Sequence, residues 1–199
     1  RAGGLYIQPF HKLRPLFKKH QIKYDFSVFK GAKSIDPEGR FSFDYSNSPK
    51  SDIYQFNEEV TKMELDGEFI EFSLNHLELK NLNKVINGVF YRLTKNKDSH
   101  KILGDGNSSG NKINNGKVKK NYFSTKETIS IELMNPIRSR LYLKTLKTNS
   151  LIHFISHPKL CSEHSLEQFD VLLKKMNHKY RTQTSVEQII STELNKIIE

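Results

Sequence analysis

The stretch SLIHFISHPKL, residues 150–160, decides the fold that we expect for this chain. Its segment 151–157 is almost continuously apolar and ends on His157, directly before Pro158. Such a run is typical of a parallel strand that is buried on both faces. A helical pattern follows at 165–176, with Ser165 and Gln168 at capping-box spacing. The apolar face of that predicted helix comprises Leu166, Phe169, Leu172, Leu173 and Met176.

A buried strand followed by a helix predicts an α/β fold. In such folds the active site lies beyond the carboxyl ends of the strands, which is where His157 stands. An unperturbed histidine changes its charge near neutral pH, so His157 is a candidate general acid. A histidine at a strand end is often structural instead, and the residues alone leave both roles open.

The N-terminal third predicts a helix and then a strand. The helix is opened by Pro9 or by Pro15, because proline is tolerated at the first helical position. Segment 22–29, IKYDFSVF, has strand composition, with its polar residues on the opposite face from its apolar ones. The polar set is Asp25 and Ser27, and the apolar set is Tyr24, Phe26 and Val28.

The middle of the chain predicts a hairpin, a loop and two helices. Segment 52–74 contains Asp66-Gly67 between strand-like runs, which is typical of a type I′ turn. Helical patterns cover 77–93 and 126–148, and Pro136 must kink or restart the second helix. The intervening loop, 95–120, is rich in Gly, Asn, Ser and Lys, and we expect it to be mobile. A last helix is expected from Ser185 onwards.

The composition narrows the class of protein. The 199 residues are 36% hydrophobic and 27% charged, and no apolar run approaches the roughly 20 residues of a membrane span. The formal net charge is +10, and the excess is concentrated in the 95–120 loop, which has seven lysines against two aspartates. The aromatic residues are not interleaved with basic ones. This pattern does not favour nucleic-acid binding. The single cysteine, Cys161, excludes an internal disulfide and predicts an inert, partly buried thiol.

Polar groups at the ends of apolar elements are the candidates for chemistry, and they are Arg1, Asp25 and His157. An arginine beside flexible glycines can bind a carboxylate through two hydrogen bonds, and Asp25 is a candidate partner for Arg1. His157 and His164, with Glu163 between them, could share a metal ion, but the pattern offers no third regular ligand. The segment GDGNSSG, 104–110, lacks the ending of a phosphate-binding loop and predicts a flexible loop.

Three segments together suggest a family. RAGGLYIQPF, IKYDFSVF and HFISHPKL, in this order, resemble the second half of the polysaccharide deacetylases, in a divergent branch associated with surface polysaccharides. The resemblance implies the C-terminal part of a distorted (β/α) barrel. It makes residues 1–199 one partial catalytic domain, with an insertion at 50–125 that carries the β-hairpin and the long flexible loop.

The resemblance also implies roles for individual residues. Arg1 matches the arginine of the substrate groove, although Gly3 replaces the usual proline, and Asp25 matches the aspartate that supports this arginine. Phe29 stands near the end of that motif, where a tryptophan is common, and the resemblance implies that it lines the substrate groove. Ile155-Ser156-His157 matches the final motif, with His157 as the general acid and Ile155 in the groove.

The implied reaction is the metal-dependent hydrolysis of N- or O-acetyl groups on a polysaccharide or oligosaccharide. The implied cofactor is a divalent metal, zinc by resemblance. The family's catalytic aspartate and its metal ligands have no counterpart here, and we expect them upstream of Arg1. The sugar, the oligomeric state and the compartment, cytoplasm or cell envelope, stay open. The alternative functions are a non-catalytic glycan-binding module on the same fold, or, from net charge alone, nucleic-acid binding.

Overall fold

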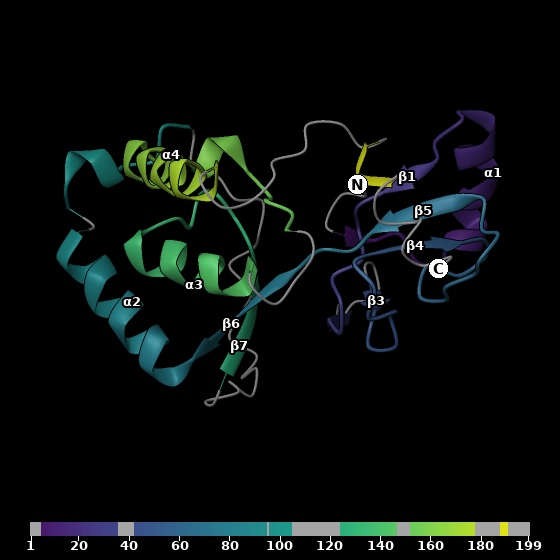
Figure 1. The fold of residues 1–199 in the computed structure, drawn as a ribbon, viewed down its shortest axis with the longest axis horizontal. Coiled ribbons are helices and arrows are strands. Elements are labelled where there is room, and N and C mark those ends of the chain that lie inside the picture. The colour runs from purple at the N-terminus through teal and green to yellow at the C-terminus, as the bar shows by residue number, and fades with distance from the viewer. Residues whose placement is uncertain are drawn as a thin grey trace. The chain divides into compact units, whose positions relative to one another are not determined.

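The structure is a computed structural model that describes residues 5–35, 42–94, 96–104, 124–146, 152–177 and 188–190 (Figure 1). It is a mixed α/β arrangement that divides into two units. Unit 1 comprises residues 1–75 and 183–199, and unit 2 comprises residues 76–182. Each unit has its own hydrophobic core, so we describe them separately.

In unit 1 the residues that the structure describes between 5 and 75 form one α-helix and five strands. The helix α1 spans Phe10–Lys19, and the strands are β1 (Tyr24–Asp25), β2 (Lys33–Ile35), β3 (Ser42–Asp44), β4 (Ile53–Phe56) and β5 (Phe69–Phe72). β5 lies between β1 and β4, parallel to β1 and antiparallel to β4. β2 and β3 form a separate antiparallel pair. Pro9, rather than Pro15, precedes the helix, which continues through Pro15.

The core of unit 1 is built around Phe10, the first residue of α1. Its ring makes edge-on contacts with Phe17, Phe56 and Phe69 at centroid distances of 5.1, 4.8 and 5.0 Å. Edge-to-face pairs of this kind add to the gain from burial alone. The helix is therefore fixed to the β4–β5 hairpin by its first turn.

The type I′ turn predicted at Asp66-Gly67 is wrong. β4 ends at Phe56 and β5 begins at Phe69, so residues 57–68 form a long connection between them. This connection folds back onto β4, where the Glu64 N–H donates to the Gln55 carbonyl oxygen at 2.8 Å. Gly67 is needed for this packing rather than for a tight turn, because a Cβ atom there would lie 2.3 Å from the Phe56 nitrogen.

The strand predicted over 22–29 is shorter in the structure, where β1 covers Tyr24–Asp25, and the polar residues of the alternation are the buried ones. Asp25 is 2% exposed and Ser27 is fully buried. The Asp25 carboxylate accepts hydrogen bonds from the Ser27 N–H at 2.9 Å and the Ser27 hydroxyl at 2.8 Å. Glu71, its neighbour across the β1–β5 pair, accepts the Val28 N–H at 2.8 Å. Burial, together with the charge of Asp25, raises the pKa of Glu71 well above its usual range.

Glu71 should therefore make the stability of unit 1 depend on pH. The folded state keeps Glu71 protonated where the unfolded chain has already ionised it, so the free energy of unfolding should fall as pH rises above the ordinary glutamate pKa. The expected slope is about 1.4 kcal/mol per pH unit, up to the raised pKa. Glu71→Gln keeps the acceptor for Val28 and should remove this slope in urea unfolding followed by circular dichroism. Equal slopes in wild type and Glu71→Gln, with the exposed Glu59→Gln as control, would contradict the assignment.

Unit 2 contains a two-stranded sheet and three α-helices. The strands are β6 (His76–Lys80) and β7 (Ser124–Thr128), and the helices are α2 (Asn81–Thr94), α3 (Pro136–Leu146) and α4 (Glu163–Asn177). The described residues of this unit also form two short 3₁₀ helices, η2 (Asp98–His100) and η3 (Pro158–Leu160). Figure 1 shows α3 beside both α2 and α4. The core comprises Leu77, Leu79, Ile129, Met134, Tyr142 and Leu172.

Both helices predicted in the middle of the chain begin as strands, so their N-terminal boundaries are wrong. β6 and β7 pair antiparallel over their whole length, from His76–Thr128 to Lys80–Ser124. Along β6 the buried residues Leu77 and Leu79 alternate with exposed ones, which is the period of a strand. The restart expected at Pro136 is confirmed, because α3 begins there. The Asn135 side chain caps it by accepting the N–H groups of Ile137 and Arg138 at 3.0 and 2.9 Å.

The segment 152–157 is extended but is not the continuous buried strand that we predicted. It makes a single parallel bridge, between Ser130 and Ile155. The helix after it begins at Glu163 and not at Ser165, because Ser162 is the capping residue. The hydroxyls of Ser162 and Ser165 each accept the other's backbone N–H, at 3.1 and 3.0 Å. Leu166, expected on the apolar face, is 44% exposed, whereas Leu172 is fully buried.

The (β/α) barrel stays a prediction, since the described strands form small separate sheets. The same holds for the insertion at 50–125 and the single partial domain. Of the loop expected to be mobile at 95–120, residue 95 and residues 105–120 lie outside the described residues. Of the helix expected from Ser185, the structure describes residues 188–190, which are helical.

Candidate functional site

His157 is placed by a short stretch of parallel pairing. The Ile155 N–H donates to the Ile129 carbonyl oxygen, and the Ile131 N–H donates to the Ile155 carbonyl oxygen, both at 2.9 Å. These bonds align residues 155–157 with residues 129–132. His157 and Glu132 therefore follow the paired segments on the same side.

His157 and Glu132 form a close pair. The Nδ1 atom of His157 lies 2.7 Å from Oε1 of Glu132, and the His157 backbone N–H donates to Oε2 at 3.3 Å. The Glu132 side chain is 9% exposed, whereas the His157 side chain is 51% exposed. The nearly buried Glu132 thus holds the Nδ1 side of the imidazole, while the rest of the ring faces solvent.

The charge state of Glu132 decides which ring nitrogen carries the proton. Burial alone would raise the pKa of Glu132, but hydrogen bonds from the backbone and from His157 outweigh it and hold that pKa below its usual range. Glu132 is therefore ionised near neutral pH and can only accept. The proton between them belongs to Nδ1 of His157, and Nε2 is the nitrogen left to exchange protons with another molecule.

The turn after His157 holds its backbone in place. η3 begins at Pro158, and the His157 carbonyl oxygen accepts the Leu160 N–H at 2.8 Å and the Cys161 thiol at 3.8 Å. Cys161 is 4% exposed, so it is more deeply buried than we predicted from the sequence. A short rigid turn on one side and a carboxylate on the other leave the ring little freedom, as a proton-transfer group requires.

The sequence prediction missed Glu132 because residues 126–148 carry a helical pattern. In the structure Glu132 follows the β7 strand and the extended residues 129–131. A strand assignment for 124–131, with Ile129 and Ile131 alternating, would have placed an acidic residue at a strand end beside His157. The alternation of Ile129 and Ile131 is visible in the sequence. The prediction gave residues 126–148 the period of a helix instead of the two-residue period of a strand.

The other predicted site residues are distributed between the two units. Ile155 lies in unit 2 with His157 and is 8% exposed. Asp25 and Phe29 lie in unit 1, where Phe29 forms a parallel bridge with Leu74. Arg1 is outside the described residues. The groove roles of Ile155 and Phe29, and the pairing of Asp25 with Arg1, stay predictions.

The histidine pair considered as a metal site is not assembled. His164 stacks on His100, with ring centroids 4.0 Å apart, while the Nδ1 atom of His157 contacts Glu132. Among the described residues, no group of three His, Cys, Asp or Glu side chains is positioned to hold a metal ion. The described part of the chain therefore does not supply the donor set of the implied divalent metal.

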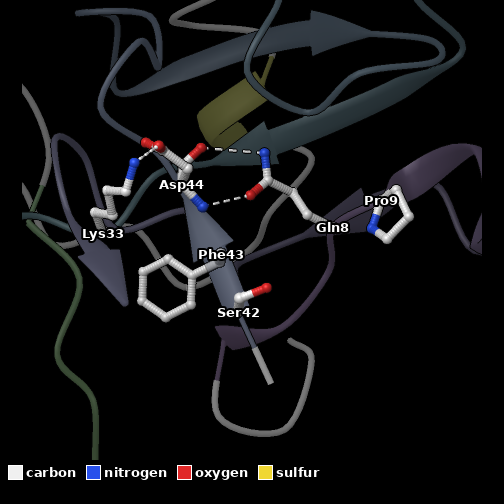
Figure 2. Close-up of a pocket in the computed structure, with 6 residues that line it drawn as sticks. All are labelled: Gln8, Pro9, Lys33, Ser42, Phe43 and Asp44. Carbon is white, nitrogen blue, oxygen red and sulfur yellow. Dashed lines mark hydrogen bonds and ion pairs between the residues drawn. The ribbon is translucent and has the colours of Figure 1, made fainter. Parts of the chain in front are cut away.

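A separate pocket of about 420 Å³ lies in unit 1 (Figure 2). Figure 2 shows the Gln8 side chain bridging to the backbone of Asp44, with Lys33 on the Asp44 carboxylate. Hydrogen bonding to Lys33 and Ser46 lowers the pKa of Asp44 to about 2. The charged and amide groups of this pocket are thus already paired with one another, which leaves them poorly suited to a reaction.

Comparison with known proteins identifies no relative of this chain. No family model, no curated protein and no solved structure matches the chain. Among the described residues, no helix is both long enough and apolar enough to cross a bilayer. The function has to be argued from the His157–Glu132 pair itself.

The Glu132 carboxylate should select the tautomer of His157. In the wild-type chain, neutral His157 should carry its proton on Nδ1, which long-range ¹H–¹⁵N correlation spectra report directly. Glu132→Gln should shift the population towards the Nε2–H tautomer, because an amide can donate to Nδ1 as well as accept from it. Glu163→Gln, which changes an exposed carboxylate in the same unit, should leave the spectrum of His157 unchanged. A wild-type ring protonated on Nε2 would refute the assignment.

Proposed function

We propose that this chain is the acid-bearing part of a metal-dependent polysaccharide deacetylase, in which His157 is the general acid. The proposed reaction removes N- or O-acetyl groups from a carbohydrate. The observation that supports it is the 2.7 Å contact between His157 Nδ1 and Glu132 Oε1, which leaves Nε2 available. A carboxylate on one ring nitrogen and an open second nitrogen are what a proton-donating histidine needs.

The contact supports an acid role more than a purely structural one. A structural histidine normally has both nitrogens satisfied inside the fold. His157 has one nitrogen bonded to a nearly buried carboxylate and a side chain that is half exposed.

His157 would act when the acetyl group leaves. As the bond between the acetyl carbon and the sugar nitrogen or oxygen breaks, the leaving atom takes the proton from Nε2 of the imidazolium. His157 becomes neutral and retains the proton on Nδ1, held by Glu132. Glu132 is a positioning residue in this proposal, since it acts through the imidazole.

The other elements of the proposal come from the resemblance of three sequence segments. They are the acetylated polysaccharide or oligosaccharide as substrate, the divalent metal, and the supporting roles of Arg1 and Asp25. Because the described residues offer no metal donor set, the proposal places the ligands elsewhere in the enzyme. Asp25 is buried and bonded to Ser27, which is consistent with a group that positions others rather than one that contacts the sugar.

Replacement of His157 tests the proposal in the active full-length protein. His157→Ala should lower kcat for acetate release from an acetylated oligosaccharide by about 10²- to 10⁴-fold, the usual contribution of general acid catalysis. KM should change little, because the imidazole contributes mainly in the transition state. Glu132→Gln should lower kcat less and should alter the pH profile.

The exposed His11→Ala, in unit 1, is the matched control and should keep the wild-type kcat. Unchanged turnover in His157→Ala would return the residue to a structural role. Absence of acetate release by the wild-type protein from every acetylated glycan tested, with glycan binding retained, would favour the non-catalytic module.

Metal titration of the 199-residue chain gives a second test. Calorimetric titration with Zn²⁺ should show no tight, stoichiometric site, because at least three protein ligands are usual for zinc and the described residues do not group them. A one-to-one site of high affinity would show that the chain carries its own ligands, and the proposed division of the catalytic groups would then be wrong.

A further inference from the structure

One face of α2 is apolar and uncovered. It carries five side chains at helical spacing whose exposed fractions run from 41% to 75%. We call this face the α2 stripe, and it comprises Leu82, Val85, Ile86, Val89 and Leu93. Isolated exposed apolar residues are ordinary, but a contiguous row along one helix indicates a contact surface.

The stripe is not the face by which α2 packs into unit 2. That face uses Asn87, whose side chain accepts a hydrogen bond from Asn135 at 3.0 Å, and Phe90, which lies 6.0 Å from the ring of His164. Thr94, one turn after Phe90, is buried and bonds the Phe90 carbonyl oxygen. The helix is therefore held by one face and presents a second, apolar one.

Arginines border the stripe on both edges. Arg92 is exposed and lies one turn from Val89 on one edge. On the other edge a small cavity of about 180 Å³ joins Ile86 to Ile137, Leu141 and the exposed Arg140. Neither arginine forms an ion pair within the part of the chain that the structure describes, and α2 contains no acidic residue.

The dimensions of the stripe argue against a second copy of the chain as its occupant. A 14-residue helix is about 21 Å long and roughly 10 Å wide, and only five partly exposed side chains make up the stripe, so it offers roughly a few hundred Å² of accessible surface. A stable protein interface takes about 800 Å² from each partner. A second copy would also place its own arginines against α2, which has no acidic residue to pair with them.

We propose that the α2 stripe docks on an anionic membrane surface. The five apolar side chains enter the boundary between headgroups and acyl chains, and Arg92 and Arg140 bind lipid phosphates beside them. Lipid requires no matching shape, so a narrow stripe is sufficient. The inference is independent of the proposed reaction and of any membrane-spanning segment.

Vesicle flotation tests this inference with the 199-residue chain. The chain should bind vesicles of phosphatidylcholine with about one-third phosphatidylglycerol, and much less to phosphatidylcholine alone, because the arginines need an anionic headgroup. Val89→Glu should weaken binding at least tenfold, as it places a charge in the apolar face. Arg92→Gln and Arg140→Gln should each weaken it about fivefold and reduce its sensitivity to salt.

Leu166→Glu is the matched control, because Leu166 is a similarly exposed apolar residue on α4. It should bind like wild type, and circular dichroism should show the same helix content in every variant. Absence of binding to anionic vesicles, or equal binding by wild type and Val89→Glu, would overturn the inference. So would light scattering that shows a wild-type dimer and a monomeric Val89→Glu, because the stripe would then be a contact between copies.

Discussion

The two backbone hydrogen bonds of Ile155 are the constraint on which the candidate site depends. They align residues 155–157 with residues 129–132, two segments that are far apart in sequence. Ile129, which accepts one of these bonds, is also part of the core of unit 2. Without that alignment His157 would stand at the end of an unpaired extended segment. With it, the imidazole and the carboxylate of Glu132 meet at hydrogen-bond distance, and the first turn of η3 fixes the backbone that follows.

Two glutamates of this chain show how local donors set the charge of one residue type. Glu132 is nearly buried but accepts two hydrogen bonds from His157, so its ionised form is favoured. Glu71 is buried beside another carboxyl group and accepts the backbone N–H of Val28, so its neutral form is favoured. Burial is common to both, and the difference lies in the neighbours. A carboxylate that orients a histidine needs an environment like that of Glu132, in which hydrogen-bond donors keep it ionised.

The sequence was sufficient for some features and not for others, for identifiable reasons. His157 could be selected as a candidate from the sequence, because a titratable residue at the end of an apolar run is visible without a fold, and its catalytic role stays a prediction. The start of α1 was one of two predicted alternatives and the restart at α3 was one of two predicted outcomes, because Pro9 and Pro136 restrict the backbone locally. β6 and β7 could not, because each is a strand only through pairing with the other. Glu132 and Glu71 were missed because burial of a polar side chain depends on contacts between distant segments.

The connection between β4 and β5 has a consequence for the solubility of the chain. β4 lies at the outer edge of its sheet, and such an edge presents backbone groups that can pair with a strand of another molecule. Here residues 57–68 occupy that edge, with the Glu64 N–H on the Gln55 carbonyl oxygen and Gly67 against Phe56. The opposite edge strand, β1, has only two residues. Both edges thus carry features that disfavour intermolecular strand addition, and replacement of Gly67 would disturb the cover over β4, because a Cβ atom there would clash with Phe56.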